Sequence, residues 1–384
     1  MKSTNQPARH DDLRCLLALS FIKDVGPVTI KRLLAAFPSA PSIFEASFEE
    51  LQRTADIKEA HARRIKDFAA WDLVEREIEQ AEQRHIRIIA CTDSSYPESL
   101  RVINGPPPVL YMKGEMHKDD TFAIAMVGSR MMSDYGRTVA HNLAFELASH
   151  GLTIVSGMAR GIDTISHKGA LKAGGRSIAV LGCGLDRPYP PENAELFEEL
   201  SHAGCVISEF PFGTPPTREN FPRRNRVISG LSLGVLVVEA TRNSGSLITA
   251  QHALDQGKEV FAVPGKITAK TSEGTNALIK KGARPVHTAE DIIEELSSLL
   301  RGLLRSRSNS SEQSNKKPSD IPDGLEISDE ERAICSVLND EPKHIDSIAR
   351  ELAMAPSKLL GLLLTLELKG IVKQTEGKNF YILF

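Results

Sequence analysis

Residues 215–226 concentrate side chains that can hold a phosphate chain and stack on a base. The segment carries four arginines against a single acid, with one phenylalanine among them. Guanidinium groups can follow the phosphates of a single strand, and an aromatic ring can stack on its bases. The prolines predict an extended first half, and apolar residues at helical spacing predict a helix after Pro222. An isolated basic run is more often a solvated loop, so its surroundings decide between the two interpretations.

Several other polar segments share one feature, because each follows an apolar run and contains glycine, serine or a charged side chain. They are residues 128–130, 156–163, 182–186, 209, 244–250 and 264–265. Glycine lets the backbone approach a ligand, and serine hydroxyls and helix-start amides donate to phosphate oxygens. Since the carboxyl ends of parallel strands meet at one edge of a sheet, these segments together predict a site for an anionic ligand.

The elements that would position these segments are seven apolar runs separated by segments with helical spacing. The runs are residues 122–127, 152–155, 178–181, 206–208, 235–238, 260–263 and 285–286. Continuous apolar runs are typical of parallel strands that are buried on both faces. The pattern predicts an α/β fold with a Rossmann-like doubly wound parallel sheet.

The flanking segments predict further domains. Helical spacing with a glycine hairpin at residues 23–28 predicts a small all-helical domain of the helix-hairpin-helix or SAM-like type, in which residues 59–85 form a helix. Apolar runs at residues 86–90 and 109–112 predict two connector strands. Near the C-terminus, three helices and a hairpin around Gly377 predict a winged helix, whose apolar third helix suits protein better than DNA. The expected divisions are residues 1–85 (helical), 86–300 (Rossmann-like, with its connector), 301–325 (flexible linker) and 326–384 (winged helix).

Composition and missing motifs disfavour several classes of function. The net charge of −3 makes any phosphate binding local, and five cysteines without a C-x-x-C pair indicate no metal site and no disulfide framework. No apolar run is long enough to span a bilayer, and the polar N-terminus lacks a signal-peptide core, so a cytoplasmic protein without a membrane partner is expected. Neither a G-x-G-x-x-G fingerprint after the first strand nor a P-loop is present, so no NAD, ATP or other cofactor is expected.

No set of side chains forms a recognisable catalytic triad, so no catalytic residue is expected. Asp163 is expected to cap its helix and hold the glycine segment, and Glu209 and Glu239 are expected to pair with arginines. The other expected pocket residues are His167, Thr249 and Gly265.

Taken in order along the chain, these segments resemble the motifs of the DNA-processing protein A family (DprA, also called Smf). The resemblance covers residues 121–290 and is carried by residues 127–130, 156–163, 179–186, 189–190, 208–209, 221–226, 244–250 and 264–265. It implies a DNA-binding protein and not an enzyme. Members of that family bind and shield the single-stranded DNA taken up in natural transformation, displace single-strand-binding protein and load the RecA recombinase. They form homodimers through the Rossmann-like domain.

The resemblance also implies roles for individual residues. Arg130 would be a principal DNA contact, Arg218 a basic residue ahead of the aromatic position, and Phe221 the ring that stacks a base. Together with the strand-end segments, the expected DNA-binding residues are Gly128, Ser129, Arg130, Ser156, Gly157, Arg160, Gly161, Arg218, Phe221, Arg223, Asn225, Arg226, Ser244, Gly245 and Ser246. Two alternatives stay open. One is a nucleotide-processing enzyme of the phosphoribohydrolase type on a related Rossmann-like fold, and the other is a transcription regulator that uses the winged helix.

Overall fold

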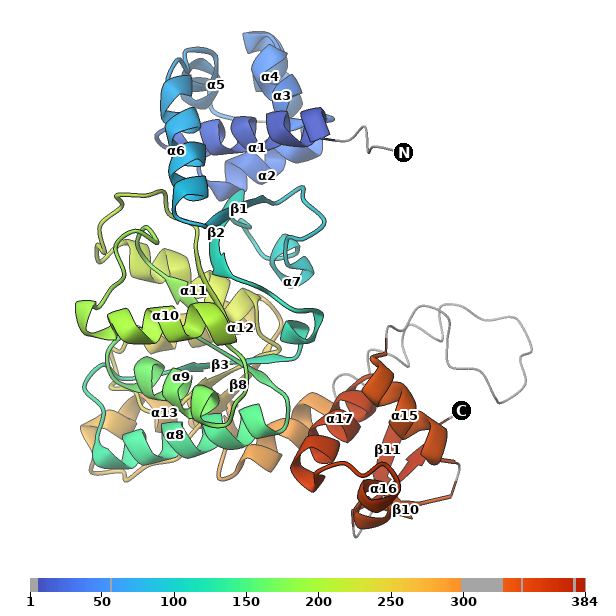
Figure 1. Ribbon diagram of the computed structural model, residues 1–384. Coiled ribbons are helices and arrows are strands. Elements are labelled where there is room, and N and C mark those ends of the chain that lie inside the picture. The colour runs from blue at the N-terminus through green and yellow to red at the C-terminus, as the bar shows by residue number, and fades with distance from the viewer. Residues whose placement is uncertain (1–5, 56, 298–326, 340, 376–377, 384) are drawn as a thin grey trace.

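A mainly parallel sheet forms the centre of the protein in the computed structural model (Figure 1). The structure describes residues 6–55, 57–297, 327–339, 341–375 and 378–383. The strands of the sheet are β1 (Arg87–Ala90), β2 (Val109–Gly114), β3 (Ala123–Val127), β4 (Thr153–Ser156), β5 (Ser177–Leu181), β6 (Gly204–Ser208), β7 (Gly234–Val237), β8 (Glu259–Ala262) and β9 (Arg284–Pro285). Their spatial order is β1-β2-β6-β5-β4-β3-β7-β8-β9.

Within the spatial order β6-β5-β4-β3-β7-β8-β9, every neighbouring pair of strands is parallel. The connector strands β1 and β2 form an antiparallel hairpin, and β2 pairs antiparallel with β6. The predicted parallel sheet is thus confirmed. The chain lays β4, β5 and β6 on one side of β3 and then returns to place β7 on the other side. In an open α/β sheet, a ligand crevice lies where the strand order reverses in this way.

Successive residues of each strand point to opposite faces of the sheet, and both faces are apolar and covered by helices. On one face, Ile124 and Met126 pack with α8 (Asp134–Ser149) and α9 (Ile162–Lys172). On the other face, Ala125 and Val127 pack with α11 (Asn220–Gly230) and α12 (Ser246–Asp255). The other helical segments of the central part are α7 (Glu98–Arg101), η1 (Lys118–Thr121), η2 (Pro191–Asn193), α10 (Ala194–Ala203), η3 (Lys270–Ser272), α13 (Glu273–Lys280) and residues 289–297.

The N-terminal part is helical, as predicted. Its described helices are α1 (Gln6–Phe21), α2 (Pro27–Ala36), α3 (Ala40–Glu45), α4 (Phe48–Ala55), α5 (Glu59–Lys66) and α6 (Trp71–Gln83). The prediction of one helix over residues 59–85 is wrong, because the chain turns between α5 and α6. Phe68 in this turn and Trp71 after it pack against Phe44, with ring centroids 6.1 and 5.1 Å from that of Phe44. This aromatic cluster packs the turn between α5 and α6 against α3.

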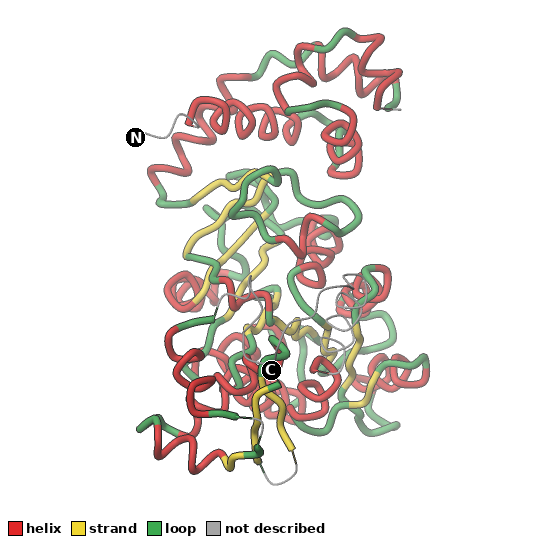
Figure 2. The backbone as a smooth tube through the Cα atoms, turned by 90° about the vertical axis from the view of Figure 1, so that its right-hand side faces the viewer, coloured by secondary structure: helices red, strands yellow, loops and turns green. Residues whose placement is uncertain are grey.

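The C-terminal part is a winged helix with α15 (Asp329–Val337), β10 (Lys343–His344), α16 (Ile345–Glu351), α17 (Pro356–Leu368), β11 (Val372–Thr375) and β12 (Asn379–Ile382). The predicted linker and Gly377 lie outside the described residues. Leu364 of α17 is buried in one cluster with Leu152 and Ile292, so the third helix packs on the central part. In the turned view, the wing strands and the N-terminal helices lie at opposite ends of the molecule (Figure 2). Among the described residues, none of the helices combines the length and apolar character that crossing a membrane requires.

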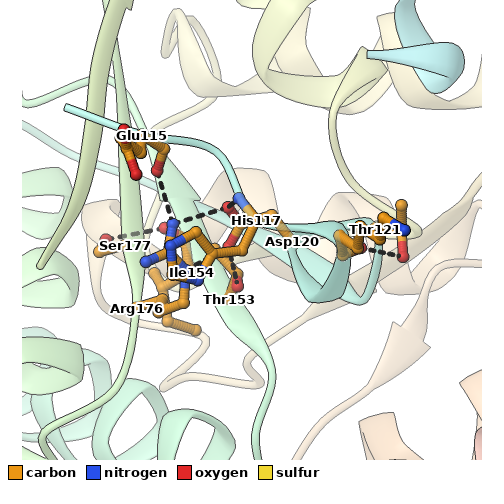
Figure 3. A network of polar contacts seen from close by, with 9 residues as sticks. Glu115, His117, Asp120, Thr121, Thr153, Ile154, Arg176 and Ser177 are labelled. Atoms are coloured by element: carbon orange, nitrogen blue, oxygen red, sulfur yellow. Dashed lines mark hydrogen bonds and ion pairs between the residues drawn. The ribbon is translucent and has the colours of Figure 1, made fainter. Parts of the chain in front are cut away.

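A buried carboxylate ties together the amino ends of β4 and β5 (Figure 3). The Asp120 side chain accepts hydrogen bonds from Nε and Nη2 of Arg176, each at 2.8 Å, and from the Thr153 hydroxyl at 2.8 Å. It also accepts from the His117 amide at 2.7 Å, and Arg176 donates to the Glu115 carbonyl oxygen at 2.7 Å. These contacts anchor the connector at the sheet edge opposite the predicted site.

Candidate nucleic-acid interface

A pocket of about 470 Å³ opens at the carboxyl edge of the sheet, between the segments that follow β3 and β7. It lies where the strand order reverses, which is the position the fold predicts for a ligand. The predicted residues that line it are Gly128, Ser129, Arg130, Asp163, Arg218, Phe221, Asn225, Ser244, Gly245, Ser246 and Thr249. The fold therefore brings four distant segments of the chain to one place.

The pocket combines free cations with an aromatic ring. The guanidinium carbon of Arg130 lies 4.7 Å from the ring centroid of Phe221. The Tyr189 ring also contacts the Phe221 ring, and the two ring centroids are 6.0 Å apart. Arg130 and Arg218 are exposed, and neither forms an ion pair within the part of the chain that the structure describes. Two cations without a carboxylate partner, beside a half-buried ring, can bind phosphate and stack a base.

Arg224 lines the same pocket but is only 3% exposed. Its Nη1 donates to the carbonyl oxygen of Gly157 at 2.7 Å and to that of Val180. Burial lowers the pKa of Arg224 to about 10, against the opposing effect of Asp163, so the guanidinium stays charged at neutral pH. A Cβ atom at Gly157 would lie 2.2 Å from Nη1. Arg224 therefore orders the segment after β4 and leaves little surface for a phosphate.

Asp163 and Gly161 hold that same segment. The expectation that Asp163 caps its helix is wrong, because Gly161 is the N-cap residue of α9 and no side chain caps it. The Asp163 carboxylate instead accepts a hydrogen bond from the Ala159 amide at 3.4 Å, which holds the glycine segment as expected. Burial raises the pKa of Asp163, and the Arg224 guanidinium opposes this effect. Gly161 has a φ of 81°, and a Cβ atom there would lie 2.2 Å from the Ser129 carbonyl oxygen. Glycine is thus required where the segments after β3 and β4 touch.

The helix that carries the arginines begins earlier than the sequence predicts. α11 starts at Asn220, so Pro222 occupies its first turn, where the missing amide has no partner to lose. At 3.6 residues per turn, Arg224 lies on the same side of α11 as the buried Val227 and Ile228. Arg224 and Asn225 are buried, whereas Arg223 is exposed and lies over Phe210, with its guanidinium carbon 5.0 Å from the ring centroid.

The two glutamates expected to pair with arginines have different partners. Glu209 forms an ion pair with Arg226, whose Nη1 also donates to the Gly105 carbonyl oxygen at 2.5 Å. Burial raises the pKa of Glu209, and Arg226 opposes this. The pairing expected for Glu239 is wrong, because its carboxylate accepts from the Ser133 amide at 2.9 Å and from the Ser133 hydroxyl at 2.6 Å. Glu239 therefore fixes the N-terminus of α8, and Arg226 is held by the protein.

Ten of the predicted residues lie outside the pocket lining, namely Ser156, Gly157, Arg160, Gly161, His167, Glu209, Arg223, Arg226, Glu239 and Gly265. Arg160 is exposed, but it forms an ion pair with Glu192, which raises the pKa of Arg160. The Ser156 hydroxyl is buried and donates to the Met126 carbonyl oxygen at 2.6 Å. Both side chains already have protein partners in this structure.

His167 and Gly265 also have structural surroundings. The His167 ring is fully buried, with Nδ1 2.7 Å from the Ser177 hydroxyl, and burial lowers its pKa to about 3. Gly265 exchanges two hydrogen bonds with the Asn276 side chain, at 3.0 and 3.2 Å. A neutral buried histidine and a bonded backbone turn thus have structural roles and lie outside the pocket lining.

Sequence reasoning missed the apolar part of the pocket lining, which includes Met131, Pro222 and Ile248. Met131 is 86% exposed, and Ile248 is 40% exposed. Each lies within two residues of a predicted polar contact. The signal that could have found them is an apolar side chain inside a polar strand-end segment, where burial in the core does not explain it.

Comparison with known proteins matches all three parts of the chain. The family model for DNA recombination-mediator protein A matches residues 87–297. Models for a DprA winged helix domain and for a SAM-like helix-hairpin-helix tandem match residues 316–378 and 16–70. Protein Smf of Escherichia coli is 41% identical over 297 residues, which are 77% of this chain and 77% of that protein.

Two further proteins extend the comparison. DNA processing protein DprA of Bacillus subtilis is 44% identical over 215 residues, which are 56% of this chain and 72% of that protein. The X-ray structure of DNA processing protein A from Streptococcus pneumoniae matches with a TM-score of 0.62 at 32% sequence identity, over 77% of this chain and 99% of that one. The chain therefore belongs to the DNA recombination-mediator protein A family.

Proposed function

We propose that this protein binds single-stranded DNA in the pocket at the carboxyl edge of its sheet. The observation that carries the proposal is the placement of exposed Arg130 over the Phe221 ring, with exposed Arg218 in the same lining. Cations bind the phosphates, and a ring can stack only on a base that is not already stacked in a duplex. Ser244 and Ser246 lie in the same lining with their hydroxyls 2.8 Å apart, so one hydroxyl donates to the other and the second can donate to a phosphate oxygen.

The biological role we propose is recombination mediation during natural transformation. The protein would shield the incoming strand, displace single-strand-binding protein and pass the strand to the RecA recombinase. Family membership and the names of the relatives, which describe DNA processing, support this role. We also propose a homodimer formed through the Rossmann-like part. A groove of about 560 Å³, lined by Leu247, Leu254 and Leu278 among others, supports that contact.

The test of strand binding compares a labelled oligothymidylate with a duplex of the same length over a range of salt concentrations. The wild type should prefer the single strand, and log affinity should fall against log salt with a slope of about −0.7 per phosphate contact. Arg130→Ala should weaken binding and flatten the slope. Arg32→Ala changes an exposed arginine of α2 and serves as the matched control that should do neither.

Two results would contradict the proposal. The first is equal affinity for single and double strands of the same length. The second is an Arg130→Ala variant that binds the oligothymidylate with the affinity and the salt slope of the wild type.

A further inference from the structure

Three exposed apolar side chains lie on the segment that follows β3 and lines the pocket, and on the segment after β8 that is bonded to it. Met131, Tyr135 and Ile267 are 86%, 52% and 93% exposed. Met131 lines the pocket, Tyr135 lies in the first turn of α8, and Ile267 lies in the segment after β8. We call these three residues the apolar ledge. Apolar side chains that gather at this exposure beside a binding pocket indicate a contact surface.

The Tyr135 side chain is oriented by a hydrogen bond, although the residue is 52% exposed. Its hydroxyl donates to the Pro264 carbonyl oxygen at 3.1 Å, which joins the start of α8 to the segment that carries Ile267. The start of α8 is fixed in turn by Ser133, whose amide and hydroxyl donate to the Glu239 carboxylate. A ring that is already oriented loses little conformational freedom when a ligand stacks on it.

The segments around the apolar ledge are rich in cations. Residues 130–137 and 264–273 contain four exposed cations and two exposed acids. The cations are Arg130, Arg137, Lys266 and Lys270, and the acids are Asp134 and Glu273. Lys266 and Lys270 flank Ile267 and form no ion pair with any described residue. The surface thus pairs apolar contact area with positive charge, which is the combination that holds a single strand.

We propose that the apolar ledge is a second subsite for single-stranded nucleic acid. The strand that leaves the pocket past Met131 stacks a base on Tyr135, and its phosphates run beside Lys266 and Lys270. This subsite rests on the proposed function of the pocket and lengthens its footprint along the strand. A second copy of the chain fits the surface less well, because a symmetric contact would bring like-charged lysines together.

The experiment measures binding of two oligothymidylates, one of about 4 and one of about 16 nucleotides, the limits of the site sizes common for single-strand binders. Tyr135→Ala should leave affinity for the short strand unchanged. It should weaken the long strand about 5- to 150-fold, the range set by stacking of one base on an aromatic ring. Tyr135→Phe keeps the ring and should retain most of the affinity for the long strand. Phe145→Ala removes another exposed ring from the same helix and is the matched control.

The outcomes separate the subsite from the pocket. If Tyr135→Ala binds the long strand as tightly as the wild type while Arg130→Ala loses both strands, the subsite is disproved and the pocket stands. If the wild type binds neither strand, the function proposed for the pocket fails as well. Sedimentation of the same variants tests the rival occupant. If Tyr135→Ala or Ile267→Glu lowers the mass of the sedimenting assembly but leaves strand affinity unchanged, the subsite is disproved and the apolar ledge contacts another copy of the chain.

Discussion

Arg130 and Arg224 line the same pocket, yet their substitution should have different consequences for stability and for the salt dependence of DNA binding. Arg224→Met removes a buried guanidinium that donates to the carbonyl oxygens of Gly157 and Val180, and it leaves Asp163 without its nearest opposing charge. At about 1.5 kcal/mol for each hydrogen bond to a charged group, the free energy of unfolding should fall by about 3 kcal/mol. Arg130→Ala removes an exposed side chain, so the free energy of unfolding should change by less than about 1 kcal/mol.

The salt dependence of DNA binding should also distinguish the two variants, because only Arg130→Ala should change it. Arg130→Ala removes one phosphate contact, so the slope of log affinity against log salt should become shallower by about 0.7. Arg224→Met should lower affinity, because the segment after β4 loses its anchor. Its slope should match that of the wild type, since a guanidinium bonded inside the protein displaces no counterion from the strand.

Urea unfolding followed by far-UV circular dichroism measures the first difference. Tryptophan fluorescence is unsuitable, because the single tryptophan, Trp71, lies in α6 of the N-terminal part. Fluorescence anisotropy of a labelled oligothymidylate measures the second difference in conditions where both variants are folded. The reasoning would be refuted by an Arg224→Met protein that keeps its free energy of unfolding and shows the shallower salt slope.

Three further predictions concern single side chains. Phe221→Ala should weaken oligothymidylate binding by about 1–3 kcal/mol in anisotropy titrations, whereas Phe221→Tyr should not, because the stacking ring remains. Asp120→Asn should lower the free energy of unfolding in urea by about 2 kcal/mol, less than for a fully buried pair because the Arg176 side chain is 24% exposed, and should leave strand affinity unchanged. Burial lowers the pKa of His167 from 6.5 to about 3, so the unfolded chain binds a proton that the folded chain does not. The free energy of unfolding should therefore fall as pH drops from about 6.5 toward 3, and His167→Gln should make that decline shallower in urea titrations at several pH values.

The strands of the sheet could be predicted because each is marked by a continuous run of apolar residues in its own segment of the sequence. The runs that became β3 and β7 are apolar throughout, and a strand buried on both faces needs no partner to reveal it. The pocket position followed from the same pattern, since strand ends meet at one edge. The turn between α5 and α6 was missed because the side chain that stabilises it, Phe44, belongs to another helix.

The partners of charged side chains could not be predicted for a related reason. Glu239 follows β7 and looks like a partner for the arginines, but its carboxylate reaches Ser133, which is 106 residues earlier in the chain. Arg224 lies one helical turn before the buried Val227 and Ile228, but Pro222 suggested a helix that starts later, so the sequence did not assign Arg224 to the buried face. Geometry of this kind appears only when distant segments are packed together.

The arginines of residues 215–226 are therefore not four equivalent phosphate ligands. Arg224 and Arg226 donate to backbone carbonyl oxygens, and Arg226 also pairs with Glu209, so both guanidinium groups are bonded within the protein. A guanidinium that is buried, or paired with a carboxylate, is expected to add little to the counterion release that accompanies strand binding. In the binding mode proposed above, the charge available to DNA comes from the exposed guanidinium groups of Arg130, which the arginine segment does not contain, and of Arg218 and Arg223 within it. We expect a protein with a net charge of −3 to hold a strand in this way, because these exposed cations form no ion pair with any described residue and make the surface around the pocket locally positive.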